Sequence, residues 1–345
     1  MIKTRLKILT GDILGSLNSA IVALPQALAF GVATGFGASA GVWGAIILCM
    51  IAGLIGGKIP LVSGITGPVT IVIASIMHAL NADISSVILV IFMAGILQII
   101  LALTSLPAIV KYVPYPVISG FMNGIGVIII LMQLNPLIGC PVMSNTINSI
   151  GAFFHNLHNI NTDALLIGSL TLAIVFAVPK RFNKIIPSQA IALVICTLVS
   201  IKMGLNVERI SEISLNMPAL TLPKAGLHEV ITYFHYAVTL AIVLSSESLL
   251  TVLVADSLIK TKTSSRNMLL GQGFGNIVCA LSGALPGSAA TMRTVAAINT
   301  GSTTRITAVI NPLILLFLLF HLSEFVAQIP LAVLAGILLM LNFLK

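Results

Sequence analysis

The stretch LPGSAATMRT, residues 285–294, interrupts a chain that is otherwise almost entirely apolar. It combines Pro286 and Gly287 with two pairs of small residues and then places Arg293 where charged side chains are rare. Proline removes a backbone hydrogen bond from a helix, and glycine makes a helix less stable. The stretch therefore predicts a broken helix, with a new half-helix that begins near Ala290 and carries Arg293 in its first turn.

The composition around this stretch is typical of a membrane protein. Of 345 residues, 58% are hydrophobic and 8% are charged, against about 25% charged residues in soluble domains. Residues 13–57, 84–110 and 112–162 contain no Asp, Glu, Lys or Arg. Because about 20 apolar residues cross a bilayer, we expect an all-α polytopic membrane protein. A soluble helical protein would need charged outer faces, which these stretches do not provide.

About twelve apolar segments are expected. They are roughly 13–34, 40–57, 67–81, 84–106, 114–134, 162–179, 187–204, 230–256, 268–283, 290–299, 306–322 and 328–344. The third and tenth are short, and they follow the Gly/Pro-rich stretches KIPLVSGITGP (58–68) and GALPGSAAT (283–291). This pattern predicts two broken helices.

The positive charges indicate the orientation. With the N-terminus in the cytoplasm, the segment count leaves only Lys202, Arg209 and Lys224 outside and Arg293 within the membrane. The remaining positive residues then fall inside: Lys3, Arg5, Lys7, Lys58, Lys111, Lys180, Arg181, Lys184, Lys260, Lys262, Arg266, Arg305 and Lys345. This asymmetry follows the positive-inside rule. It also accounts for the net charge of +8, so no nucleic-acid partner is expected.

Three weak internal matches indicate a repeat. Residues 113–120 match 329–336 at an offset of 216, and residues 62–70 match 285–293 at an offset of 223. The polar residues Gln26 and Glu247 lie 221 apart. This offset spans an odd number of segments, so the second copy is expected to be inverted in the membrane. Inverted repeats with broken helices are typical of secondary transporters, which bind substrate where the breaks meet.

Glu247 and Arg293 are the two ionised groups expected deep in the apolar segments, and intramembrane charges are usually functional. If half-helices begin at residues 66–70 and near Ala290, their backbone N–H groups and positive dipole ends form an anion site. We expect the substrate-binding residues to be Gln26, Phe30, Thr66, Thr70, Ala290, Thr291 and Arg293, with Ser248 as a further hydroxyl. Two alternatives are a structural Glu247–Arg293 pair and an Arg293 that reaches the cytoplasmic surface.

Glu247 and Thr251 lie four residues apart, on one helix face. A buried carboxylate beside hydroxyl and carbonyl groups can hold Na⁺ or take up a proton. We therefore expect them to bind the coupling cation, Na⁺ or H⁺, with no other metal or cofactor. His155 and His158, expected in a loop, are too few for a metal site, and the chain contains no phosphate-binding loop for ATP. No catalytic residues are predicted, and the protein is not expected to be an enzyme.

Six stretches resemble the SulP family of anion transporters, the sulfate permease group that includes the SLC26 proteins. They are ALPQALAFG (23–31), SGITGP (63–68), VPYPVISGFMNG (113–124), SSESLLTVLVADSL (245–258), GQGFGNIVCALSGALPGSAATMRT (271–294) and INTGSTTRIT (298–307). The resemblance implies seven-plus-seven inverted repeats, a core and a gate domain, and elevator-type transport. It places Gln26, Phe30, Thr66, Ala290 and Arg293 at substrate-lining positions, and Glu247 and Thr251 at the cation position.

The family pattern predicts a domain division. Residues 1–106 and 228–322 would form the core domain, and residues 107–227 and 323–345 the gate domain. Family members usually have fourteen segments and then a cytoplasmic STAS domain, whereas this sequence ends at Lys345 in or after the twelfth segment. The second repeat is thus expected to be incomplete. A separate chain that supplies the rest, and a homodimer, are the partners that the resemblance suggests.

The function expected from these observations is secondary active transport of sulfate or bicarbonate across a bacterial inner membrane. The sequence LPGSAATMRT resembles that of sodium–bicarbonate members of the family. Those members carry Asp where Glu247 stands, whereas dicarboxylate and proton-coupled members carry Glu. Transport of C4-dicarboxylates and a non-transporting truncated fragment remain alternatives. An anion channel and a nucleobase or ascorbate transporter of the same fold are less favoured, the latter because Arg293 suits an anion.

Overall fold

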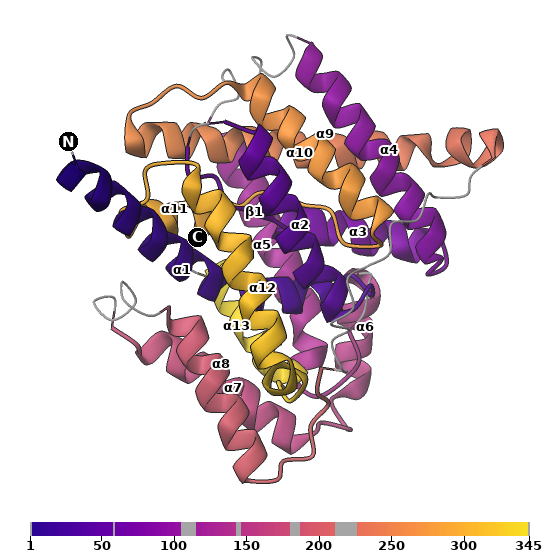
Figure 1. The fold of residues 1–345 in the computed structure, drawn as a ribbon. Helices are drawn as coiled ribbons and strands as arrows, with labels where there is room; N and C mark the ends of the chain where they lie inside the picture. Colours follow the sequence, from indigo (N-terminus) through magenta and orange to yellow (C-terminus); the bar gives the residue numbers. More distant parts are fainter. Residues whose placement is uncertain are drawn as a thin grey trace.

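The computed structural model describes residues 2–57, 59–104, 115–142, 146–179, 187–210 and 226–343. Several positions that indicated the orientation lie outside these ranges: Lys58, Lys111, Lys180, Arg181, Lys184, Lys224 and Lys345. The described residues form an all-α membrane protein with two very short strands (Figure 1).

The element order repeats along the chain. The first copy contains α1 (Ile2–Ala33), α2 (Ala38–Ile55), β1 (Ser63–Gly64), α3 (Gly67–Ala79), α4 (Ile84–Leu103) and α5 (Tyr115–Leu137). The helices α6 (Thr146–Asn156), α7 (Thr162–Ala177) and α8 (Ser188–Lys202) follow. The second copy contains α9 (Leu227–Ile259), α10 (Ser265–Leu281), β2 (Ser288–Ala289), α11 (Thr291–Asn299), α12 (Ile306–Ala327) and α13 (Leu331–Phe343). Both expected breaks are present, each as a two-residue strand followed by a short helix.

The helices differ from the expected segments in two places. α1 covers the expected apolar segment, roughly 13–34, and also extends before it through the basic N-terminal residues to Ile2. α6 was not expected at all, and His155 lies in this helix instead of in a loop. Its 11 residues, TINSIGAFFHN, are too few and too polar to give the signal of a membrane span, which needs about 20 apolar residues.

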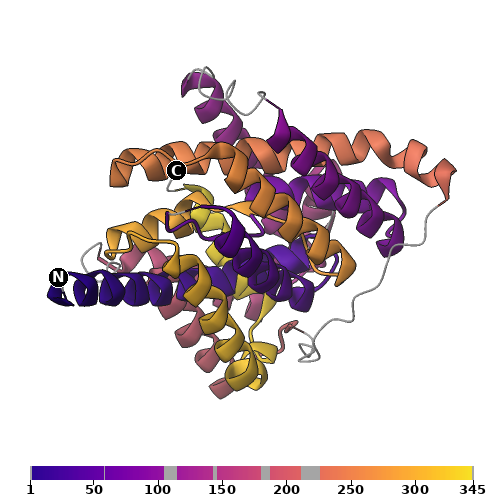
Figure 2. The ribbon, with the colours of Figure 1, turned by 45° about the horizontal axis from the view of Figure 1, so that its top comes forward.

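Within the residues that the structure describes, five helices are long and apolar enough to cross a membrane. They cover Ile8–Ala33, Ala38–Ile55, Ile84–Leu103, Leu227–Ile259 and Ile306–Ala327. The 33 residues of α9 extend about 50 Å at 1.5 Å per residue, and the N-terminal part of this helix projects from the body of the molecule (Figure 2). Its exposed Leu227 and Ile231 are suited to lipid contact.

The helices pack in two groups. In one, α1–α4 and α9–α12 contact one another around the two strands. In the other, α13 packs against α5, α7 and α8, and α6 packs against α5. The main contacts between the groups are those of α1 with α13 and α8, and of α3 with α5. Figure 1 shows α7 and α8 at the bottom, away from α9 and α10 at the top.

A third buried charged residue, Asp12, was missed by the sequence analysis. It is 0% exposed, and its carboxylate accepts hydrogen bonds from Thr303 N at 2.8 Å, Thr304 N at 3.1 Å and Thr307 Oγ1 at 3.2 Å, and from Thr304 Oγ1. Asn18 Nδ2 also donates to Thr300 Oγ1, at 2.8 Å. The first helix thereby holds the loop between α11 and α12, which fixes the end of α11.

Candidate functional site

The two breaks cross at one point. β1 and β2 pair antiparallel, with Ser63 opposite Ala289 and Gly64 opposite Ser288. Ala290 N donates to Val62 O at 2.9 Å, and Val62 N donates to Thr294 Oγ1 at 3.1 Å. The half-helices α3 and α11 begin directly after the strands. Because the strands run in opposite directions, the half-helices leave the crossing with their N-termini toward each other, as expected of an inverted repeat.

The crossing depends on a close approach of two backbones. A Cβ atom on Gly287 would lie 2.2 Å from the carbonyl carbon and oxygen of Gly64. No side chain fits in this space, because both obstacles are backbone atoms. Gly287, which the sequence indicated only as a helix breaker, therefore also lets the two strands touch.

Neither half-helix has a side-chain cap at its N-terminus. The N-cap residues are Thr66 for α3 and Ala290 for α11, and neither makes a side-chain capping hydrogen bond. Threonine is a common N-cap residue, but the Thr66 hydroxyl donates to Glu247 Oε2 at 2.5 Å instead. The first-turn N–H groups of both half-helices carry partial positive charge and receive no side-chain cap, although Pro68 in the first turn of α3 has no N–H group.

Arg293 lies in the first turn of α11 and is 0% exposed. Its Nη2 donates to Ile65 O at 2.7 Å, whereas Nε and Nη1 are buried without a hydrogen-bond partner among the described residues. The alternative that Arg293 reaches the cytoplasmic surface is therefore wrong. The guanidinium lies within Coulombic range of Glu247, but its hydrogen bond goes to a backbone carbonyl. Two unpartnered donors on a buried cation are suited to hydrogen bonds with an anion.

Glu247, in α9, connects the two breaks. Its Oε2 atom accepts hydrogen bonds from Thr66 Oγ1 at 2.5 Å and from Ser288 Oγ at 2.7 Å, and these two hydroxyl oxygens lie 3.1 Å apart. Thr66 belongs to the first repeat and Ser288 to the second. The side chain is 5% exposed. A change in the charge of this carboxylate would therefore alter a hydrogen bond at each of the two breaks.

The hydroxyl groups of α9 that lie next to β2 form hydrogen bonds with it. Thr251 Oγ1 donates to Ala289 O at 2.8 Å and lies 2.7 Å from Thr291 Oγ1, while Ser248 Oγ accepts from Ala289 N at 3.1 Å. Glu247, Ser248 and Thr251 thus all face the second break. Thr70, by contrast, donates its hydroxyl to Thr66 O at 2.8 Å within its own half-helix.

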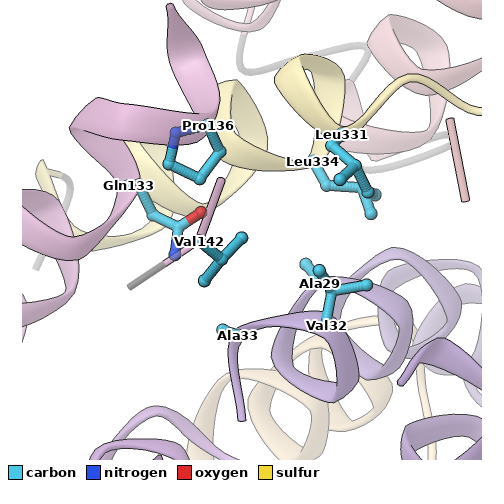
Figure 3. A pocket seen from close by; sticks show the side chains of 8 residues that line it. All are labelled: Ala29, Val32, Ala33, Gln133, Pro136, Val142, Leu331 and Leu334. Atoms are coloured by element: carbon cyan, nitrogen blue, oxygen red, sulfur yellow. The ribbon is translucent and has the colours of Figure 1, made fainter. Parts of the chain in front are cut away.

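Gln26 and Phe30 lie one turn apart on α1, and each is 6% exposed. α1 packs against both α3 and α11, but no polar contact joins Gln26 to the hydroxyl cluster in the described part of the chain. A small pocket lies between α1, α5 and α13. Figure 3 shows Gln133 lining it opposite Ala29 and Val32. It contains none of the predicted substrate-binding residues, so it is not the predicted site.

Sequence reasoning missed several residues that hold this site. Ser288 lay within the quoted break, but only the structure gives it a role, as a donor to Glu247. Gln98, Gln272 and Asn276 form buried contacts with one another or with the strands. Their signal in the sequence is that each is a polar residue within an apolar segment.

Comparisons with known proteins identify the family and the fold. A family model described as the sulfate permease family matches residues 9–343. The bicarbonate transporters BicA of Picosynechococcus sp. and Synechocystis sp. are 37% and 38% identical, over 97% of this chain and 61% of each relative. The solved transmembrane domain of a cyanobacterium bicarbonate transporter BicA matches with a TM-score of 0.90 and 39% identity, over 97% of this chain and 88% of that chain. The chain thus spans less than two thirds of the length of these curated relatives.

Proposed function

Because this chain belongs to the sulfate permease family, we propose that it transports a small inorganic anion, bicarbonate or sulfate, by secondary active transport. The observation that carries the proposal is the fully buried Arg293 with unpartnered Nε and Nη1 atoms, beside two half-helix N-termini that lack side-chain caps. Such an arrangement replaces the hydration of an anion with fixed donors.

The substrate site comprises Gln26, Phe30, Thr66, Thr70, Ala290, Thr291 and Arg293. Arg293 and the first-turn N–H groups would hold the charge of the anion, and Thr66 and Thr291 would line the site, with their hydroxyl protons directed to Glu247 and Thr251 in this structure. Gln26 and Phe30 on α1 would close the site from the opposite side. Bicarbonate is favoured by the names of the relatives with 37% and 38% identity, and sulfate by the name of the family. A C4-dicarboxylate is a candidate because Glu247 stands where bicarbonate members are expected to carry Asp.

Glu247 and Thr251 form the coupling-cation site in this proposal. The carboxylate contacts Ser288 Oγ, and the Thr251 hydroxyl contacts the carbonyl of the next residue, Ala289. These groups would supply the oxygen ligands that Na⁺ prefers. For H⁺ coupling, the same carboxylate would take up the proton and become a donor. In either case the cation acts on Thr66 and Ser288, which connect the coupling site to both half-helices.

Transport would follow an elevator mechanism, in which the group of helices around the strands moves as the core domain (residues 1–106 and 228–322). The helices α5 to α8 and α13 would form the gate (residues 107–227 and 323–345). The contacts support this division, because helices pack mainly within each group and α1 and α3 provide the main contacts between them. We propose a bacterial inner membrane with the N-terminus in the cytoplasm, as the positive-inside rule predicts.

The test is uptake by liposomes that contain the purified chain. Labelled bicarbonate, sulfate and a C4-dicarboxylate would each be supplied with an inward Na⁺ gradient, an inward H⁺ gradient or none. Uptake of bicarbonate or sulfate that requires one gradient supports the proposal and names the coupling ion. Uptake without any gradient would indicate a channel. Binding without uptake would indicate a chain that needs a further subunit, and neither binding nor uptake would overturn the proposal.

Two variants make the test specific to the site. Arg293→Ala removes the buried guanidinium and is expected to weaken anion affinity by at least about tenfold, or about 1.4 kcal/mol. Arg266→Ala is the matched control, since Arg266 is an exposed arginine in the first turn of α10. Equal anion affinity in the two variants would remove Arg293 from the site.

A further inference from the structure

Three buried amide side chains lie beside the crossing of the two strands, and no role was predicted for them. Gln98 is in α4, and Gln272 and Asn276 lie one turn apart in α10. Their exposed fractions are 0%, 1% and 0%. Burying an amide in apolar surroundings is unfavourable unless it forms hydrogen bonds. The hydrogen bonds of these three amides therefore indicate which parts of the structure they hold in place.

Asn276 contacts the backbone of Gly287 twice. Its Nδ2 donates to Gly287 O at 3.0 Å, and Gly287 N donates to its Oδ1 at 2.9 Å. Asn276 Nδ2 also donates to Gln98 Oε1 at 2.9 Å, which fixes the orientation of the amide. On the other strand, Gln272 Nε2 donates to Ser63 Oγ at 2.6 Å. The helix α10 thus contacts both breaks through side chains one turn apart.

The pair of hydrogen bonds between Asn276 and Gly287 reproduces what a neighbouring strand would provide. An amide side chain has one donor and one acceptor group, like a peptide unit. β1 and β2 contain only two residues each, and a two-stranded ribbon is marginally stable even when it is longer. An additional partner for Gly287 is therefore needed to hold β2 in one position in the absence of a third strand.

We propose that Asn276 is a positioning residue for the anion site. Its amide acts as a third strand edge for Gly287 and thereby fixes Ser288, the donor to Glu247, and Ala290, the N-cap of α11. Gln98 orients Asn276, and Gln272 supports β1 through Ser63. The role in anion binding rests on the proposed function, whereas the clamp on the backbone does not.

Hydrogen exchange tests the clamp without any substrate. Asn276→Ala removes the acceptor of the Gly287 N–H group, so exchange in peptides that cover residues 285–290 should become faster. Asn276→Asp keeps an oxygen acceptor and should retain most of the protection. Asn267→Ala is the control, because Asn267 is exposed in the first turn of the same helix. Equal exchange in Asn276→Ala and Asn267→Ala would overturn the clamp.

Anion affinity tests the positioning role. We expect Asn276→Ala to weaken bicarbonate or sulfate binding by about tenfold, Asn276→Asp by less, and Asn267→Ala not at all. If Asn276 had a purely structural role, Asn276→Ala would lower the stability but leave the anion affinity of the folded protein unchanged. That result would overturn the proposal. If Asn276→Ala does not fold, Gln98→Leu and Asn276→Asp decide, with about threefold weaker binding expected in each. Absence of binding by the unmodified chain would overturn the proposed function instead, and exchange would still decide whether the clamp exists.

Discussion

Substituting Gly64 by alanine would place a methyl group against the guanidinium of Arg293. Gly64 has a φ of +152°, a conformation that residues with a side chain rarely adopt. A Cβ atom there would lie 2.7 Å from Arg293 Nη1, 3.1 Å from Nη2 and 3.2 Å from Ala45 Cβ. The guanidinium must therefore move by several tenths of an ångström.

The expected size of the effect follows from these contacts. Nη2 is held to Ile65 O at 2.7 Å, and a hydrogen bond from a charged donor contributes about 1.5–3 kcal/mol. Weakening this bond and displacing the cation should reduce anion affinity by about tenfold, which corresponds to about 1.4 kcal/mol. The strained backbone of the substituted residue should lower the free energy of unfolding by about 1–3 kcal/mol.

Titration calorimetry would measure anion affinity, and thermal unfolding would measure stability. Gly124→Ala is the matched control, because Gly124 lies in α5 and a Cβ atom there would meet nothing within 4 Å. Alanine inside a helix is favoured over glycine by about 0.5–1 kcal/mol, so the control should bind anion normally and be at least as stable. An unchanged anion affinity in Gly64→Ala, measured on folded protein, would show that the guanidinium does not contact the substrate.

Three further results are expected. Glu247→Gln removes the carboxylate charge that Thr66 and Ser288 contact, so uptake and anion affinity should both lose their dependence on the cation while anion binding itself is retained. Parallel uptake and binding assays with and without the cation measure this, and an anion affinity that still rises with the cation would contradict it. Asp12→Ala should lower the free energy of unfolding by at least about 3 kcal/mol, because four donors lose a charged acceptor; a loss no larger than that of Asp83→Ala, about 1 kcal/mol for a helix cap, would contradict this. The hydrogen bond from Ser86 lowers the pKa of Asp83, the N-cap of α4. The Asp83 carboxylate therefore stabilises the fold above about pH 4, and this contribution is lost as the pH falls below that value. Thermal unfolding of Asp83→Asn should accordingly depend less on pH below about pH 4.

The breaks were predictable because they violate a simple pattern. An apolar membrane segment tolerates irregular backbone only where it is buried in protein or lines a cavity, so KIPLVSGITGP and GALPGSAAT were visible against their surroundings. The start of α11 was expected near Ala290, and its N-cap is Ala290. The same reasoning found Arg293 and Glu247, since each is a rare charge within an apolar run.

Asp12 and α6 were missed for different physical reasons. Asp12 stands between the basic N-terminus and the first apolar run, where a carboxylate is usually solvated. Its partners are Thr303, Thr304 and Thr307, about 290 residues away in the sequence, and no periodicity connects them. α6 is short and includes polar residues, so hydropathy could not separate it from a loop. Both depend on tertiary contacts that local patterns do not contain.

The hydrogen-bond partner of Thr66 illustrates the limit of local rules and explains the site. Threonine before Gly67 and Pro68 reads as an N-cap, and the structure places it at the N-cap position, but its hydroxyl serves Glu247 on α9. A locally satisfied cap would have occupied the N–H groups that an anion needs. The carboxylate withholds the cap from α3 and contacts Ser288 of the other repeat, so occupancy of the cation position by Na⁺ or H⁺ would alter the donors on both sides of the anion site. In the proposed mechanism, coupling would require no long pathway, because Thr66 and Ser288 connect the Glu247 carboxylate to both breaks.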